Sequence, residues 1–357
     1  MRYLVFQLTL HGMKQRRRHF PRLKLITLVI LLLIIIAWVT WSFWPSSARQ
    51  MKRSVAIVAC QSWYEMVCKG KTILYFSDIA ADTALVRPSL QQDSCVRTTY
   101  STGVWVNRYA FMPSCRGRMV TVMAKPDEIN RQDARKLIEN EKERNKKRIR
   151  QLRDQLKELN YYLRINNVHD EGYNTVAAYA YEKEAEKASY EKEAEKAHCI
   201  RLAQLFDTVR KTDRPQLIRK AVYTAYYRLP NGECQQARMR EVGSSKQCQT
   251  VLLQTVGRTT PTGVAPLSVF FVNGKSHGAA LAVGYGGLGV EELASSDASC
   301  SIIPTTIHDN RHDLPAVLGG DGSPVFSTRG YFIGITRGNE VITRSQLRDL
   351  LRKEKQP

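Results

Sequence analysis

The chain has 357 residues, enough for one sizeable globular domain with accessory segments. Its 54 basic and 33 acidic side chains give a net charge of +21, a balance often found in nucleic-acid-binding proteins. No zinc-finger or RNA-binding motif is present, and neither a Cys-x-x-Cys nor a His-Glu-x-x-His spacing occurs, so we expect no nucleic-acid partner, no metal and no cofactor.

The first segment of the chain is typical of a membrane anchor. Residues 1–24 carry seven basic side chains and no acidic one, and residues 25–44 carry no charge. As a helix, residues 25–44 would be about 30 Å long, which spans a bilayer. Only Arg49, Lys52 and Arg53 follow closely, so the positive-inside rule places the N-terminus in the cytoplasm. We expect a single-pass protein with a periplasmic or extracellular main domain, most simply in a bacterial inner membrane.

A cleaved signal peptide is the alternative, with small residues for cleavage at 46–48. The apolar run is longer than the 7 to 15 residues usual in signal peptides, which favours an uncleaved anchor. Outside the leader the chain keeps 47 basic against 33 acidic residues, a net charge of +14. In an envelope compartment such a charge favours anionic surfaces as partners.

All the cysteines follow the apolar segment, which places them on the predicted outer side. They are Cys60, Cys68, Cys95, Cys115, Cys199, Cys234, Cys248 and Cys300. An even number in an oxidising compartment indicates disulfides, although eight cysteines allow about 105 pairings. Proximity within hairpins would allow Cys60 to pair with Cys68 and Cys234 with Cys248.

Residues 126–220 are predicted to form a charged helical insertion. A stripe of apolar residues at steps of three and four indicates a helix that pairs with another; its members are Ile149, Leu152, Leu156, Leu159 and Leu163. The pattern stops near residues 166–172, and a tandem nine-residue repeat follows at 181–189 and 190–198. We expect two antiparallel helices, acting either as a solitary hairpin or as an arm for self-association or partner docking. Tyr181 and Tyr190 could pack on the apolar stripe or face a partner.

Three glycine-containing motifs lie in the C-terminal third. Residues 319–326 read Gly-Gly-Asp-Gly-Ser-Pro-Val-Phe, residues 284–286 read Gly-Tyr-Gly, and residues 334–338 read Gly-Ile-Thr-Arg-Gly. Thr343 and Gln346 form a capping box before a terminal helix.

The first of these motifs resembles the nucleophile loop of trypsin-like serine proteases, Gly-Asp-Ser-Gly followed by Gly or Ser and Pro. With Gly322, Ser323 and Pro324 as anchors, Asp321 takes the nucleophile position, in an oxyanion loop that also contains Gly319 and Gly320. A one-residue deletion is the other alignment, and then the nucleophile is missing. Ser323, two residues downstream, is a weak candidate for a relocated nucleophile.

The resemblance extends to the other two triad positions. Residues 101–106 look like the hairpin strand and residues 111–115 like the family's Thr-Ala-Ala-His-Cys segment, which puts Ser114 in the place of the histidine. Residues 249–253 look like the strand that the aspartate opens, which puts Gln249 in its place. The family's habit of bridging the cysteine beside the histidine implies a Cys95–Cys115 disulfide.

The resemblance therefore implies a mainly β protein with a trypsin-like double β-barrel, formed by residues 45–125 and 221–357. Ser114, Gln249 and Asp321 cannot perform acyl transfer, which needs a hydroxyl, an imidazole and a carboxylate. His277, His308 and His312 are the histidines of the folded C-terminal half, and we interpret them as surface-loop residues. The carboxylate of Asp321 should plug the cleft by pointing at the oxyanion donors.

The family's substrate strand corresponds to Thr336, Arg337 and Gly338, where Arg337 would favour an acidic ligand segment. We therefore expect a catalytically inactive, membrane-anchored pseudoprotease that binds or scaffolds an envelope protein or peptide. The alternatives are an active serine peptidase with a non-standard nucleophile and a mainly structural coiled-coil component.

Overall fold

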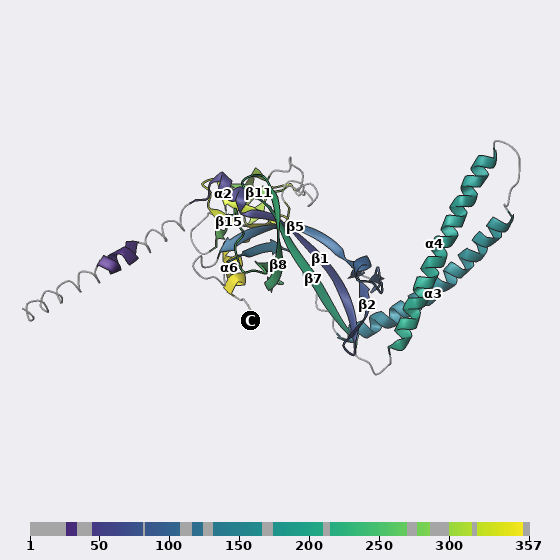
Figure 1. The fold of residues 1–357 in the computed structure, drawn as a ribbon. Helices are drawn as coiled ribbons and strands as arrows, with labels where there is room; N and C mark the ends of the chain where they lie inside the picture. The colour runs from purple at the N-terminus through teal and green to yellow at the C-terminus, as the bar shows by residue number, and fades with distance from the viewer. Residues whose placement is uncertain are drawn as a thin grey trace, which may run out of the picture. The chain divides into compact units, whose positions relative to one another are not determined.

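The computed structural model describes ten segments of the chain, namely residues 26–33, 45–80, 83–107, 116–123, 131–165, 174–209, 215–269, 277–285, 300–315 and 320–352. The chain divides into two compact units, the first formed by Met1–Ala59, Tyr100–Ala124 and Thr224–Pro357, and the second by Cys60–Thr99 and Lys125–Tyr223. Figure 1 follows the chain from purple to yellow.

Residues 26–33 are helical, and their large apolar side chains are exposed. In the described part of the chain, no helix is both long enough and apolar enough to cross a membrane. The leader at 1–24 and most of the predicted span at 25–44 lie outside the described residues, so the membrane anchor stays a prediction.

The first unit contains two closed barrels. The strands of the first are β1 (Val55–Cys68), β5 (Arg97–Asn107), β6 (Arg118–Val122), β7 (Gln216–Arg228), β8 (Cys234–Ser245) and β9 (Thr250–Thr255). They belong to a sheet of order β10-β5-β6-β9-β8-β7-β1-β2, which includes the short β10 (Leu267–Ser268) and β2 (Lys71–Phe76). An additional pairing between β5 and β1 closes the six strands of the barrel into a ring. The strands β1 and β7 each extend from the first unit into the second.

The strands of the second barrel are β11 (Gly278–Gly284), β12 (Ser301–His308), β13 (Arg311–His312), β14 (Pro324–Ser327), β15 (Phe332–Arg337) and β16 (Glu340–Thr343). They close in the order β11-β12-β13-β16-β15-β14. When the six strands of each barrel are numbered along the chain, both rings read 1-2-3-6-5-4. Two barrels with this shared order fit a chymotrypsin-like fold, and the prediction of a mainly β double barrel is confirmed.

The strands β14 and β15 of the second barrel are buried on both faces. Val325 and Ile333 belong to one apolar cluster, whereas their chain neighbours Phe326 and Phe332 belong to a larger one. Successive side chains of a strand point to opposite faces, so the alternation separates the two clusters.

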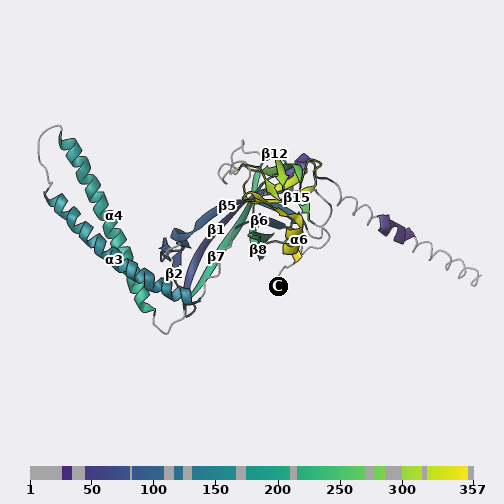
Figure 2. The same cartoon turned by 180° about the vertical axis from the view of Figure 1, so that it is seen from behind.

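The helix α6 (Arg344–Arg352) adds Leu347, Leu350 and Leu351 to the larger cluster and contacts β15 (Figure 2). The N–H of Thr343 donates to Oε1 of Gln346 at 2.8 Å, so the predicted terminal helix and its capping contact are confirmed.

The second unit contains the predicted helical insertion, as α3 (Arg131–Ile165) and α4 (Asn174–Thr208). The ion pairs Lys142–Asp207 and Arg148–Glu195 join the two helices. The residue later in α3, Arg148, pairs with the residue earlier in α4, Glu195, so the two helices are antiparallel, as predicted. Figure 1 shows them side by side.

The helices pack on the outer part of the β1–β2 hairpin. The shared apolar cluster consists of Tyr64, Met66, Leu74, Phe76, Leu85, Ile138, Leu202 and Phe206. The short strands β3 (Asp78–Ile79) and β4 (Leu85–Val86) and the 3-10 helix η1 (Asp93–Cys95) complete the unit. Leu152 and Leu156 of the apolar stripe are buried, whereas Tyr181 and Tyr190 are 63% and 73% exposed, so these tyrosines do not pack on the stripe.

The two disulfides predicted from proximity within hairpins are wrong. Cys60 and Cys68 lie on the same strand, β1, about 26 Å apart at strand spacing, and no disulfide joins them. Cys234 opens β8 and Cys248 follows its far end, and both are free. A disulfide needs Cα atoms within about 7 Å. Cys95 is a buried thiol that donates to the carbonyl of Arg87 at 3.1 Å, and its implied partner Cys115 lies outside the described residues, so that bridge stays a prediction.

Candidate functional site

The loop before β14 is held in place by backbone hydrogen bonds. Gly322 N–H donates to Thr336 C=O at 2.8 Å, and Thr336 N–H donates to Ser323 C=O at 2.9 Å. The Thr336 hydroxyl donates to Gly320 C=O at 2.9 Å and accepts from Ser323 N–H at 3.0 Å. The backbone of Asp321 is tied to the first barrel, because Thr102 N–H donates to its carbonyl at 2.9 Å.

Gly322 allows this loop to approach the first barrel closely. Its φ is +90°, and a Cβ atom there would lie 2.0 Å from the carbonyl oxygen of Thr102 and 3.4 Å from the backbone nitrogen of Val122. Both the left-handed conformation and the close approach require glycine. The Gly-Ser-Pro part of the motif therefore serves the packing of the two barrels.

The first barrel contributes the turn between β8 and β9. Gln249 lies directly before β9 with a φ of +50°, and its carbonyl accepts from Met123 N–H at 2.9 Å, just after β6 ends. The turn between the fifth and sixth strands is therefore hydrogen-bonded to the end of the third strand, and it carries the side chain of Gln249.

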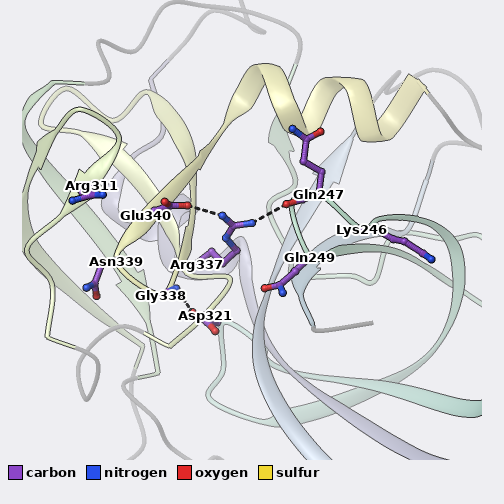
Figure 3. A pocket seen from close by; sticks show the side chains of 9 residues that line it. All are labelled: Lys246, Gln247, Gln249, Arg311, Asp321, Arg337, Gly338, Asn339 and Glu340. Atoms are coloured by element: carbon purple, nitrogen blue, oxygen red, sulfur yellow. Dashed lines mark hydrogen bonds and ion pairs between the residues drawn. The ribbon is translucent and has the colours of Figure 1, made fainter. Parts of the chain in front are cut away.

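The loop and the turn border a pocket of about 710 Å³ (Figure 3). It is lined by Lys246, Gln247, Gln249, Arg311, Asp321, Arg337, Gly338, Asn339 and Glu340. Gln249, Asp321, Arg337 and Gly338, which belong to three different motifs of the sequence, meet in this pocket. Thr336 lies directly behind it, whereas Ser114 and Gly319 lie outside the described residues, so their assigned roles stay predictions.

The carboxylate of Asp321 binds the backbone of the substrate-like strand. Its Oδ1 accepts from Gly338 N–H at 2.7 Å, so the prediction that this carboxylate points at the oxyanion donors is wrong. The N–H and C=O of Thr336 are already bonded to the loop. In this state, strand addition at Thr336 and Gly338 is blocked by the protein's own groups.

Arg337 is the central cation of the pocket. Its Nη2 pairs with Oε2 of Glu340 at 2.5 Å, and its Nη1 donates to the carbonyl of Gln247 at 3.0 Å (Figure 3). The guanidinium group therefore bridges the β15–β16 turn and the β8–β9 turn. Its own carboxylate partner partly neutralises the charge that the sequence analysis assigned to an acidic ligand.

Ser323 does not face the pocket. It is 1% exposed, and its hydroxyl donates to the hydroxyl of Thr102 at 3.5 Å. A hydroxyl nucleophile needs a base within hydrogen-bond reach, and a threonine hydroxyl is not a base near neutral pH. Among the described lining residues, the pocket has no hydroxyl, thiol or imidazole.

His312 is buried on β13, so its interpretation as a surface-loop residue is wrong. Its Nδ1 accepts from Leu314 N–H at 3.2 Å. Burial lowers the pKa of this imidazole, and the Gly338 backbone, Asp313 and Asp321 offset the shift in part. Next to it, hydrogen bonds from Thr305 and Thr306 lower the pKa of Asp313 to about 2. His277 and His308 are exposed, as expected.

The end of β6 offers a second match that the sequence analysis missed. Residues 121–125 read Thr-Val-Met-Ala-Lys, which can be aligned with Thr-Ala-Ala-His-Cys so that Ala124 takes the place of the histidine. Val122 ends the third strand, and the N–H of Met123 donates to the carbonyl of Gln249, whose side chain lines the pocket. The signal was the apolar run Met119–Val122 followed by a charged segment. Neither alignment places a histidine there.

Comparison with known proteins adds little to this geometry. No protein-family model matches the chain, and no curated protein matches it. Solved structures do match, among them the crystal structure of Deg5, with 13% sequence identity and a TM-score of 0.29 over 36% of this chain. The match spans 66% of the Deg5 chain. Because both the sequence identity and the TM-score are this low, the fold is assigned from the strand order of the two barrels.

Proposed function

We propose that this protein is a non-catalytic relative of trypsin-like proteases that binds a protein or peptide segment in the pocket between its two barrels. The supporting observation is the chemistry of the pocket: the positions that resemble the triad carry Gln249 and Asp321, and the described lining residues offer no hydroxyl, thiol or imidazole. Ser323, the one serine of the motif, is buried against Thr102. Binding is the role that this site retains when acyl transfer is lost.

The decisive test is labelling of the 357-residue chain with a fluorophosphonate probe, followed by mapping of any adduct. We expect no specific labelling of the folded protein, and trypsin serves as the positive control. Specific labelling that disappears in Ser323→Ala would support an active peptidase instead and would overturn the proposal.

The proposal includes a membrane anchor at residues 25–44, with residues 1–24 on the cytoplasmic side and both units in the periplasm or outside the cell. The support is the charge asymmetry of the leader and the exposed apolar side chains of residues 26–33. Protease protection of the C-terminal part in sealed, right-side-out spheroplasts would contradict this topology.

Self-association through the helical arm is a second candidate role. The helix α3 carries 12 basic and 6 acidic residues, whereas α4 carries 5 basic and 7 acidic ones. Lys146, Arg150, Arg153 and Lys157 form an exposed stripe on α3, and Tyr179, Tyr181 and Tyr190 are exposed on α4. A second copy could pair its acidic α4 with this basic stripe. Sedimentation equilibrium should then show a dimer that Arg150→Glu/Arg153→Glu dissociates; a wild-type monomer would exclude this role.

A further inference from the structure

Three cations line the pocket, and they differ in their partners. Arg337 is bound to Glu340 and to the carbonyl of Gln247. Lys246 comes from the first barrel and Arg311 from the second; both are exposed, and no ion pair or hydrogen bond of either side chain is found within the described part of the chain. The pocket therefore has two cations on opposite sides that are available to an anion.

Two carboxylates of the protein occupy the remaining donors. Asp321 accepts from Gly338 N–H, and Glu340 pairs with Arg337. Both are at the surface, with the side chain of Glu340 52% exposed. Exposed ion pairs contribute little to stability, because water and salt screen them. An incoming carboxylate could therefore replace either group at little cost.

We propose that the pocket recognises an acidic peptide segment, with Lys246 and Arg311 as its anchors and with Asp321 and Glu340 as internal competitors for the donors Gly338 N–H and Arg337. This inference rests on the proposed non-catalytic binding role and adds the class of ligand. Carboxylate groups suit the site because its donors are one backbone N–H, one guanidinium already holding a carboxylate, and two further cations.

The backbone bonds of the site favour side-chain carboxylates over an added β-strand. The N–H and C=O of Thr336 are both used by the loop before β14, whereas the N–H of Gly338 is held by the exposed carboxylate of Asp321. A ligand segment that spans from Lys246 to Arg311 would contact both barrels across the pocket. Recognition would then depend on charge, and binding should weaken as the salt concentration rises.

The test uses the 357-residue chain in nanodiscs of zwitterionic lipid and a fluorescein-labelled hexaglutamate peptide, with binding measured by fluorescence anisotropy. Asp321→Asn/Glu340→Gln removes the competing charges and keeps the side-chain shapes. We expect it to bind the peptide about five-fold or more tightly than the wild type. Lys246→Ala/Arg311→Ala should bind about ten-fold or more weakly.

Matched variants separate the site from the effect of net charge. Glu233→Gln/Asp349→Asn and Arg258→Ala/Arg329→Ala change the charge by the same amounts at exposed residues outside the pocket, and we expect both to bind like the wild type. The proposal is overturned if each pocket variant behaves like its charge-matched control, or if hexaglutamate binds none of the variants. Either result would leave the proposed non-catalytic role intact, because that role fails only if the fluorophosphonate probe labels a nucleophile.

Discussion

The two barrels share one strand order and differ in the connection between their third and fourth strands. In the second barrel this connection, residues 313–323, ends in a loop that hydrogen bonds join to β15 and β5. In the first barrel it runs from residue 123 to 215 and contains the helices α3 and α4. The same point of the topology thus carries the glycine-containing loop before β14 in one barrel and a helical arm in the other. Barrel closure constrains the strands, whereas this connection is free to change.

The largest expected effect would show whether the arm folds as a unit of its own. Phe206→Ala empties a fully buried position among residues of the second unit, so we expect a loss of about 3 to 5 kcal/mol in the stability of that unit. Urea unfolding followed by far-ultraviolet circular dichroism would measure the loss. Tyr190→Ala, at an exposed position of the same helix, should change stability by less than about 0.5 kcal/mol. Loss of hexaglutamate binding in Phe206→Ala would show that the two connections are not independent.

The second effect concerns the short connection. Gly322→Ala should destabilise the first unit by about 2 kcal/mol or more, because the new Cβ meets the Thr102 carbonyl and the φ is positive. Thermal unfolding would measure the change. Gly338→Ala is the control, since its φ is also positive, at +53°, but no atom lies within 4 Å of the added Cβ. Equal losses in the two variants would mean that backbone strain alone, and not the contact between barrels, fixes Gly322.

The third effect is a pH dependence specific to the second barrel. The folded-state pKa of His312 is below its unfolded value, so the unfolded state binds the proton first and stability falls as the pH drops below about 6.5. Protonation at Nδ1 also removes the acceptor of Leu314 N–H. The slope can reach about 1.4 kcal/mol per pH unit.

Urea midpoints between pH 7.5 and 5.5 would reveal the slope, and His312→Asn, which can still accept from Leu314, should flatten it. Asp313→Asn is the contrasting variant. Its folded pKa of about 2 lies below the unfolded value, so its contribution is present above about pH 4 and is lost as the pH falls toward 2. A wild-type slope that survives in His312→Asn would contradict the assignment.

The smallest expected effect is that of the Arg337–Glu340 pair. Glu340→Gln should change the stability of the protein by less than about 1 kcal/mol, since the pair is partly exposed. The same substitution should nevertheless strengthen hexaglutamate binding. Differential scanning fluorimetry and anisotropy on one sample would separate these two outcomes, and a large loss of stability would mean that Glu340 has a structural role.

The sequence predicts more of the second barrel than of the first. Asp321, Arg337 and Gly338 could be found because a local motif of glycines and proline marks them, and Gln249 because an apolar strand follows it. The helical arm could be predicted from its apolar stripe and its repeat. Three features could not be predicted, because they depend on contacts between segments far apart in the chain. They are the outer β1–β2 hairpin, the burial of His312 and the role of the end of β6. The pairs Cys60–Cys68 and Cys234–Cys248 were predicted from closeness in the sequence, which does not show whether both cysteines lie on one strand.

The contact between Gly322 and Thr102 also affects how such chains are recognised. A search for protease sequences gives weight to the glycine that follows the nucleophile, yet here the space between two barrels requires that glycine. Selection for folding alone would therefore be enough to keep this glycine. A match at this glycine therefore indicates shared architecture. Whether such a chain is an active enzyme has to be judged from the residue that precedes the glycine.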